Sequence, residues 1–294
     1  MSIPPFLHLP NGVIQRSLST ARGEFASLDN EAAVRPATGQ LAGTALFIPG
    51  FTGSKEDFIA VLGPLAAAGM RAVAVDLRGQ YESKGPPERE EYSLAGFAAD
   101  VLEIIRDLPG PVHLVGHSMG GLVAREVVLG DPLAIASLVL MSSGPEAIPE
   151  FHRPRMQLFA QVLAQAGLEV VWAAKQALEE EEGSRGPTDP TIANFVTQRF
   201  LANSPGSLLT MVEVLCSEPN RAAELATVAP PTLVCFGDRD DMWSPDEQRK
   251  MSETLESRRT ELPGVGHSPA AQAPAETVAA LLEFWDEILA APHG

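Results

Sequence analysis

The amino-acid sequence predicts an α/β fold: a mostly parallel sheet of eight strands flanked by helices, with a helical cap inserted after the sixth strand. Short apolar runs alternate along the chain with segments whose apolar residues recur at helical spacing, which is typical of a parallel sheet covered on both faces. Between residues 145 and 228 this alternation stops, and helical patterns follow one another without a convincing strand. The 294 residues, 45% of them hydrophobic, suffice for a full core.

The first half of the chain supplies most of the expected sheet. Residues 45–48 form a short apolar run that ends in Pro49-Gly50, and a helix is expected to begin near Ser54. Residues 112–115 are a second apolar run, and the helical spacing of Leu122, Val123 and Val127 follows it. The expected strands of this half lie near residues 13–19, 24–29, 45–48, 72–76, 112–116 and 137–142, and the helices near 55–68, 93–107 and 119–130.

The second half opens with the interruption and then returns to alternation. The interruption contains helical patterns near 155–166, 168–181, 190–203 and 206–217. Two further strands are expected near 232–236 and 260–263, with helices near 245–257 and 274–290. We therefore expect one core domain formed by residues 1–144 and 229–294, and a helical cap formed by residues 145–228.

The pentapeptide Gly116-His117-Ser118-Met119-Gly120 lies at the junction of an expected strand and an expected helix. A serine at such a junction is held in a tight, strained turn that exposes its Oγ, and the flanking glycines remove Cβ atoms that would collide across the turn. The N–H groups at the start of the following helix can stabilise negative charge that develops beside the serine. The pattern predicts that Ser118 is a nucleophile.

A serine nucleophile needs a base, and the base needs an acid that orients it. The apolar run 232–236 ends in a loop that contains Asp240, and His267 lies in a Gly/Pro-rich loop before the last helix. In parallel sheets, ligands bind beyond the carboxyl ends of the strands, where Ser118, Asp240 and His267 are all expected.

With these residues, the chain resembles the α/β-hydrolase fold enzymes that use a Ser-Asp-His triad. The resemblance implies that Ser118 attacks, His267 acts as the base and Asp240 orients it, because Gly237-x-x-Asp240 is similar to the acid loop of the family. The alternatives to Asp240 are its neighbours Asp238 and Asp241. Glu146 is a further one, since some members place the acid after the sixth strand.

The resemblance also implies the two donors of an oxyanion hole, the backbone N–H groups of Phe51 and Met119. Many relatives have His-Gly where this chain has Pro49-Gly50, a difference that leaves the donating amide in place. In the loop over residues 76–83, Tyr81 stands where relatives often carry glycine, so the backbone path of this loop is expected to differ locally.

The substrate pocket is expected to be apolar, because the interval 145–228 is rich in large apolar residues. Trp172 in the cap, and Met242 and Trp243 after the acid, are the candidates for its lining. Arg153 and Arg155 lie at the entrance to the cap in an otherwise acidic chain. They could bind a substrate carboxylate or, as the favoured interpretation, pair with acidic neighbours and fix the hinge.

Composition limits the class of partner. The net charge of −17 argues against nucleic acid or an anionic membrane surface, and fits an enzyme that acts on a neutral small molecule. The chain shows no signal peptide and no apolar run long enough to span a bilayer, so a cytoplasmic location is expected. No spacing of His, Cys or carboxylates indicates a metal site, and the implied chemistry requires no cofactor. Nothing in the sequence indicates an oligomeric state.

These observations together predict a serine hydrolase that cleaves a carboxylic ester, or a related acyl bond, of a small and largely apolar substrate through an acyl-enzyme. The alternatives on the same triad are a carbon–carbon bond hydrolase, a thioesterase and a lactonase. A non-catalytic small-molecule receptor on the same scaffold is the alternative from another class, since fold alone does not determine function.

Overall fold

The computed structural model describes residues 1–31, 43–181, 183 and 186–290. Its sheet has eight strands in the order β1-β2-β4-β3-β5-β6-β7-β8. The pairs β1/β2 and β2/β4 are antiparallel, and all the others are parallel, as predicted. The strands are β1 (Ile14–Thr20), β2 (Gly23–Asp29), β3 (Thr44–Ile48), β4 (Arg71–Val75), β5 (Val112–His117), β6 (Ser137–Met141), β7 (Thr232–Gly237) and β8 (Arg258–Leu262).

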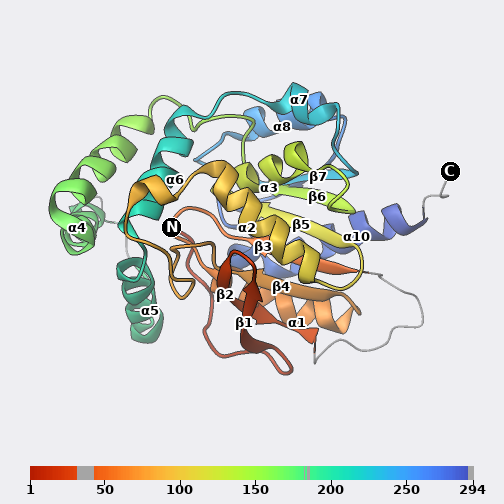
Figure 1. Ribbon diagram of the computed structural model, residues 1–294, viewed down its shortest axis with the longest axis horizontal. Helices are drawn as coiled ribbons and strands as arrows, with labels where there is room; N and C mark the ends of the chain where they lie inside the picture. Colours follow the sequence, from red (N-terminus) through yellow and green to blue (C-terminus); the bar gives the residue numbers. More distant parts are fainter. Residues whose placement is uncertain (32–42, 182, 184–185, 291–294) are drawn as a thin grey trace.

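Helices cover both faces of the sheet (Figure 1). In the core they are η2 (Lys55–Phe58), α1 (Ile59–Ala67), η3 (Arg89–Glu91), α2 (Leu94–Asp107), α3 (Met119–Gly130), α8 (Pro245–Thr254), α9 (Pro269–Gln272) and α10 (Pro274–Ala290). The strands β3, β5, β6 and β7 are buried throughout, and consecutive residues belong to opposite sides. Leu114 belongs to the apolar cluster that includes residues of α2, α3 and α8, whereas Val115 belongs to the cluster that includes residues of α1 and α10. This alternation is the reason that both faces of the sheet need helices.

Local sequence signals explain where several helices begin. The Ser93 hydroxyl accepts the Gly96 N–H at the start of α2, and Ser244 with Glu247 forms a capping box at the start of α8. In α5 (Pro190–Leu201), the Asp189 carboxylate caps the first turn, and a proline stands inside it.

The predicted helical insertion after β6 is confirmed. It consists of α4 (Arg153–Glu181), α5, α6 (Pro205–Ser217) and α7 (Ala222–Ala226), and α4 to α6 gather at one end of the molecule (Figure 1). The two helices expected near 155–166 and 168–181 are one element with a break at Gly167, whose φ of 84° is non-helical. The short helices α7 and α9 were not predicted, because four or five residues are too few to show helical periodicity.

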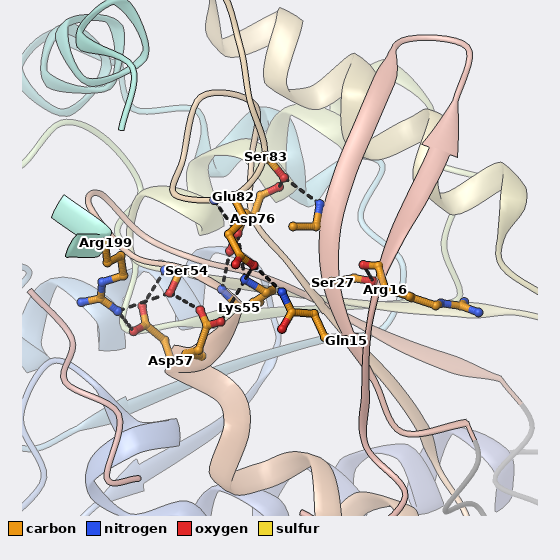
Figure 2. Close-up of polar contacts among 12 residues, drawn as sticks. Gln15, Arg16, Ser27, Ser54, Lys55, Asp57, Asp76, Glu82, Ser83 and Arg199 are labelled. Carbon is orange, nitrogen blue, oxygen red and sulfur yellow. Dashed lines mark hydrogen bonds and ion pairs between the residues drawn. The ribbon is translucent and has the colours of Figure 1, made fainter. Parts of the chain in front are cut away.

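A buried ion pair joins α5 to the core. Arg199 has no exposed side-chain surface, and its Nη1 lies 2.6 Å from Oδ1 of Asp57, which is also buried. The same guanidinium donates to the hydroxyl of Ser54 at 3.4 Å and to the carbonyl of Ser2 at 2.6 Å. Figure 2 shows Arg199 pointing toward Ser54 and Asp57. The contact fixes α5 to the segment that follows β3.

A second buried charge lies beside this ion pair. The Nζ of Lys55 contacts Asp76 at 3.1 Å, Glu82 at 2.6 Å and Glu56 at 2.9 Å (Figure 2). Burial acts to lower the pKa of Lys55, but these carboxylates raise it above its ordinary value, so Lys55 is charged. The ring of Tyr81 lies 4.7 Å from the ammonium.

Replacing Arg199 by Met is expected to lower the free energy of unfolding by about 3–5 kcal/mol, because it leaves the carboxylate of Asp57 buried without its partner. Urea unfolding followed by circular dichroism measures this. The matched control is Arg89→Met, since Arg89 also links the core to the insertion, through Glu213 on α6, but both side chains of that pair are about half exposed. The control is expected to cost less than about 1 kcal/mol. Equal losses in the two variants would show that burial does not set the strength of the Arg199 pair.

Candidate active site

Ser118 occupies a strained turn between β5 and α3. Its φ of 55° and ψ of −123° lie outside the regions that L residues prefer. A Cβ on Gly116 would collide with the backbone of Gly120, and one on Gly120 would lie 2.5 Å from the carbonyl oxygen of Ile48. The Ser118 N–H donates to the carbonyl of Met141 at 2.9 Å. The two glycines therefore permit the turn that the sequence pattern predicts.

The structure brings Ser118, His267 and Asp240 together in one hydrogen-bonded chain. Oγ of Ser118 lies 2.9 Å from Nε2 of His267, and Nδ1 of His267 lies 2.9 Å from Oδ1 of Asp240. A carboxylate cannot donate, so Nδ1 carries the hydrogen and donates the hydrogen bond to Asp240. Nε2 is then free to accept the hydrogen of the Ser118 hydroxyl. This is the tautomer in which His267 can act as a base.

The Asp240 carboxylate is buried and fully engaged. Oδ1 also accepts the N–H of Met242 at 3.0 Å, and Oδ2 accepts Nε2 of Gln248 at 3.0 Å. Burial acts to raise the pKa of Asp240, but the hydrogen bonds from His267, Met242 and Gln248 outweigh it, so the pKa lies below its ordinary value. Asp240 is thus ionised when His267 is neutral.

Two alternative acids have other partners. The carboxylate of Asp238 accepts the backbone N–H of Gly264 at 2.7 Å, and that of Glu146 accepts the side-chain amide of Asn220 at 3.2 Å. Among the described residues, the carboxylate that hydrogen-bonds to His267 is that of Asp240.

Gln248 is a site residue that the sequence analysis missed. It is fully buried on α8, and besides Asp240 it holds the carbonyl of Trp243 at 2.9 Å. The available signal was a polar residue inside a buried helical stripe, since Met251, Ser252 and Leu255 follow Gln248 at helical spacing and are buried. A buried amide must find hydrogen-bond partners, and here one of them is the carboxylate of Asp240.

The loop after β3 passes directly against the serine. A Cβ on Gly50 would lie 2.9 Å from Cβ of Ser118 and 3.3 Å from its Oγ. We find no acceptor among the described residues for the backbone N–H groups of Phe51 and Met119, which the sequence predicts to form the oxyanion hole. Both amides belong to residues adjacent to this contact, so they can donate to an oxygen that develops charge beside Ser118.

His117 supports the loop that carries His267. Its Nε2 donates to the backbone carbonyl of His267 at 2.7 Å, and the two rings lie 5.2 Å apart between centroids. Burial, followed by the proximity of His267, lowers the pKa of His117 to about 4. His117 is therefore neutral at neutral pH and acts through position rather than charge.

The basic segment at the entrance to α4 binds backbone carbonyls. Nε2 of His152 donates to the carbonyl of Asp241 at 2.6 Å, and Nε of Arg153 donates to the carbonyl of Ile148 at 2.9 Å. Arg153 thus binds a backbone carbonyl five residues earlier rather than the acidic side chain expected from the sequence, and it is His152 that ties the start of the insertion to the loop after β7. Both contacts fit a role of this segment in fixing the hinge.

The three candidate lining residues differ in their surroundings. Trp243 has no exposed surface, and its Nε1 donates to the carbonyl of Glu146, in the segment after β6, at 3.2 Å. Its ring centroid lies 6.3 Å from that of His267. Trp172 is buried against Phe200 on α5, with ring centroids 5.0 Å apart. Met242 is partly buried and packs against the apolar cluster that includes residues of both the sheet and the insertion.

Phe51, which the sequence predicts only as a backbone donor, also makes an aromatic contact through its side chain. Its ring meets the ring of Phe159 on α4 edge to face, with centroids 5.2 Å apart. The ring of Phe159 in turn meets the ring of Phe200 edge to face, with the two ring centroids 6.2 Å apart. The loop after β3, which carries Phe51, is therefore in direct apolar contact with the insertion.

The described residues contain neither a candidate metal site nor a candidate membrane span. Within the described ranges, no group of three or more His, Cys, Asp or Glu side chains could hold a metal ion. In the same part of the chain, no helix combines the length and the apolar character needed to cross a bilayer.

The chain is similar to a protein-family model, to curated proteins and to solved structures. The model of the alpha/beta hydrolase family matches residues 45–281. Among curated proteins, the chain is 38% identical to bifunctional epoxide hydrolase 2 of Sus scrofa over 91 residues, 29% of this chain and 16% of that protein. It is 29% identical to pimeloyl-(acyl-carrier protein) methyl ester esterase of Aeromonas hydrophila over 184 residues, 61% of this chain and 70% of that protein. The chain spans less than half the length of several other curated relatives that it matches.

Solved structures show the same architecture. A thermophilic esterase from Thermogutta terrifontis superposes with a TM-score of 0.72, covering 94% of this chain and 99% of that one at 21% identity. Similarity at this identity shows the shared fold.

Proposed function

Because the chain belongs to the alpha/beta hydrolase family, we propose that it is a serine hydrolase that cleaves the carboxylic ester of a small, largely apolar substrate through an acyl-enzyme. The observation that carries this proposal is the hydrogen-bonded chain from Ser118 through His267 to Asp240, with both contacts at 2.9 Å.

In the proposed reaction, Nε2 of His267 removes the hydroxyl proton of Ser118 as Oγ attacks the acyl carbonyl. The resulting imidazolium is stabilised by the carboxylate of Asp240. The N–H groups of Phe51 and Met119 donate to the oxyanion, and losing one such donor typically costs about 3–4 kcal/mol in the barrier. His267 then protonates the leaving alcohol, and water hydrolyses the acyl-enzyme by the same steps.

Relatives support an ester as the substrate. The Aeromonas protein named above is a methyl ester esterase, and the Thermogutta structure is that of an esterase. Epoxide hydrolase 2 also matches, although over a small part of its length. The first experiment is turnover on a panel of p-nitrophenyl esters, thioesters and lactones. Turnover of thioesters or lactones well above esters would favour those alternatives, and the absence of repeated turnover on every member would favour a receptor.

We expect a preference for uncharged, apolar acyl groups. Phe51 on the loop that passes Ser118 contacts Phe159 of the insertion, and the apolar Met242 lies two residues after Asp240. Each buried methylene contributes about 0.8 kcal/mol. The value of kcat/KM should therefore rise about fourfold for each added carbon and then fall once the pocket is full. Steady-state kinetics on esters of increasing acyl length test this.

Half-esters of dicarboxylic acids provide the opposing test. If Arg153 or Arg155 binds a substrate carboxylate, a half-ester should be hydrolysed faster than the methyl ester of the matching monoacid. A strong preference for the half-ester that disappears in Arg153→Ala or Arg155→Ala would overturn the apolar pocket. Since Arg153 already binds the carbonyl of Ile148, we expect no such preference.

A further inference from the structure

Gln80 is a fully buried polar residue on the loop after β4, and its side chain reaches the loop after β3. Its Nε2 donates to the carbonyl of Gly50 at 2.8 Å, and its Oε1 accepts the backbone N–H of Leu77 at 3.2 Å. A carbonyl can only accept and an N–H can only donate, so the two partners fix which end of the amide is which. The side chain therefore has one orientation, set at both ends.

The carbonyl that Gln80 holds belongs to the same peptide unit as the N–H of Phe51. A trans peptide is planar, with its C=O and N–H pointing in opposite directions, so fixing one fixes the other. The Gly50 carbonyl also accepts the N–H of Gly53 at 3.0 Å. Two hydrogen bonds thus hold this peptide plane against rotation, with the Phe51 N–H directed away from Gln80.

We propose that Gln80 is a positioning residue for the oxyanion hole: by holding the Gly50 carbonyl, it aims the Phe51 N–H at the oxygen of the tetrahedral intermediate. This inference rests on the proposed hydrolase function. Hydrogen bonds to the carbonyl also polarise the peptide, which makes its N–H a stronger donor. Gln80 does not touch the substrate, and its effect passes through the Gly50–Phe51 peptide.

The turn that carries Gln80 is itself rigid. The Gln80 N–H donates to the carbonyl of Leu77 at 2.8 Å, and the Ser83 N–H donates to the carbonyl of Gln80 at 2.9 Å. Gly79 in this turn accepts the N–H of Ser204, which precedes α6, at 2.7 Å. A side chain mounted on such a turn can hold its partner in place without a further loss of backbone entropy. The uncharged amide also avoids placing a further charge in a buried site.

The test compares Gln80→Met with the unaltered protein. Met has a similar shape but cannot donate, so the packing is kept and the hold on the Gly50 carbonyl is lost. We expect kcat on p-nitrophenyl acetate to fall by about 10- to 100-fold, less than the loss of a whole oxyanion donor, with KM within about threefold. The inhibition constant of phenylboronic acid, whose adduct on Ser118 is tetrahedral, should rise by about 10-fold or more.

Three further variants make the outcome decisive. Gln80→Leu also removes the donor, and either Gln80 variant that folds suffices for the test. Ser83→Ala removes two hydrogen bonds from the same turn, to the carbonyl of Asp76 and from the N–H of Ala26, without touching Gly50 (Figure 2). It is expected to lower stability but leave kcat and boronate affinity within about twofold. Ser118→Ala reports on the proposed function itself.

The results separate the two hypotheses. If a folded Gln80 variant matches Ser83→Ala in kcat and in boronate affinity while Ser118→Ala is inactive, the role of Gln80 is overturned and the hydrolase proposal stands. If Ser118→Ala keeps its turnover, the proposed function fails. A fall in thermal stability of a Gln80 variant without a change in boronate affinity also overturns the inference, because it would show a purely structural role.

Discussion

Replacement of Ser118 by Ala is expected to abolish ester hydrolysis while leaving the fold intact. Ala lacks the Oγ that attacks the acyl carbonyl, and it differs from Ser by that one atom, so it fits the same turn with φ near 55°. Loss of a triad nucleophile leaves only binding and oxyanion stabilisation, so kcat should fall by about 10⁴-fold or more. Turnover of p-nitrophenyl acetate and circular dichroism on the same preparation measure both effects.

Ser142 provides a matched control for this substitution. It follows β6, is fully buried, and like Ser118 has a positive φ, here 46°. Its Oγ has no hydrogen-bond partner among the described residues. Ser142→Ala should therefore retain activity close to that of the unaltered protein. A folded Ser118→Ala variant with activity within about tenfold of the control would remove Ser118 from the mechanism.

The elements that the sequence predicted well are those defined by short-range patterns. The strained turn at Ser118 depends on glycines two residues away on each side, and the alternation of apolar runs with helical stripes located all eight strands. The loops with Asp240 and His267 follow directly after β7 and β8, so their meeting with Ser118 at the carboxyl edge of the sheet needs only the topology.

Contacts between distant segments could not be predicted in the same way. The bond from Gln80 to Gly50 joins residues 30 apart in sequence, and the pair of Arg199 with Asp57 joins residues 142 apart. In each case the local sequence shows only a polar residue, which by default is expected to be exposed. Which partner it meets depends on how the loop after β3 packs against the loop after β4 and against α5. The periodicity of apolar residues predicts helices and strands, but it does not predict how these distant segments pack against one another.

The loop after β7 is a second place where the sequence could not identify the contact that forms. Three aspartates lie within residues 238–241, and their spacing alone does not separate them. In the structure, the carboxylate of Asp238 binds a backbone amide, whereas Asp240 points inward to His267 and Gln248. A buried carboxylate must find donors, and the geometry gives Asp240 three of them.

Asp240→Asn is expected to lower kcat by about 10³- to 10⁴-fold, because it disturbs the tautomer of His267. The new amide has one oxygen and one nitrogen where Asp240 has two acceptors. If its oxygen faced Nδ1 of His267, its nitrogen would face Nε2 of Gln248, and two donors would meet. Gln248 cannot rotate freely to resolve this, since its Nε2 also donates to the carbonyl of Trp243 at 2.9 Å. If instead its nitrogen took the place of Oδ1, two donors would meet at the N–H of Met242, which donates to Oδ1 at 3.0 Å.

Either orientation of the amide is expected to lower kcat. With its oxygen toward His267, the charge that stabilises the imidazolium is lost. The other orientation turns its nitrogen toward His267. Nδ1 must then accept, the proton moves to Nε2, and His267 can no longer take the proton of Ser118. The measurement is kcat on p-nitrophenyl acetate, with Asp238→Asn and Glu146→Gln as controls that should change kcat by less than about threefold, since neither carboxylate touches His267. If Glu146→Gln proved the damaging change and Asp240→Asn the mild one, the acid would lie after β6, and the bond between Asp240 and His267 would have no part in catalysis.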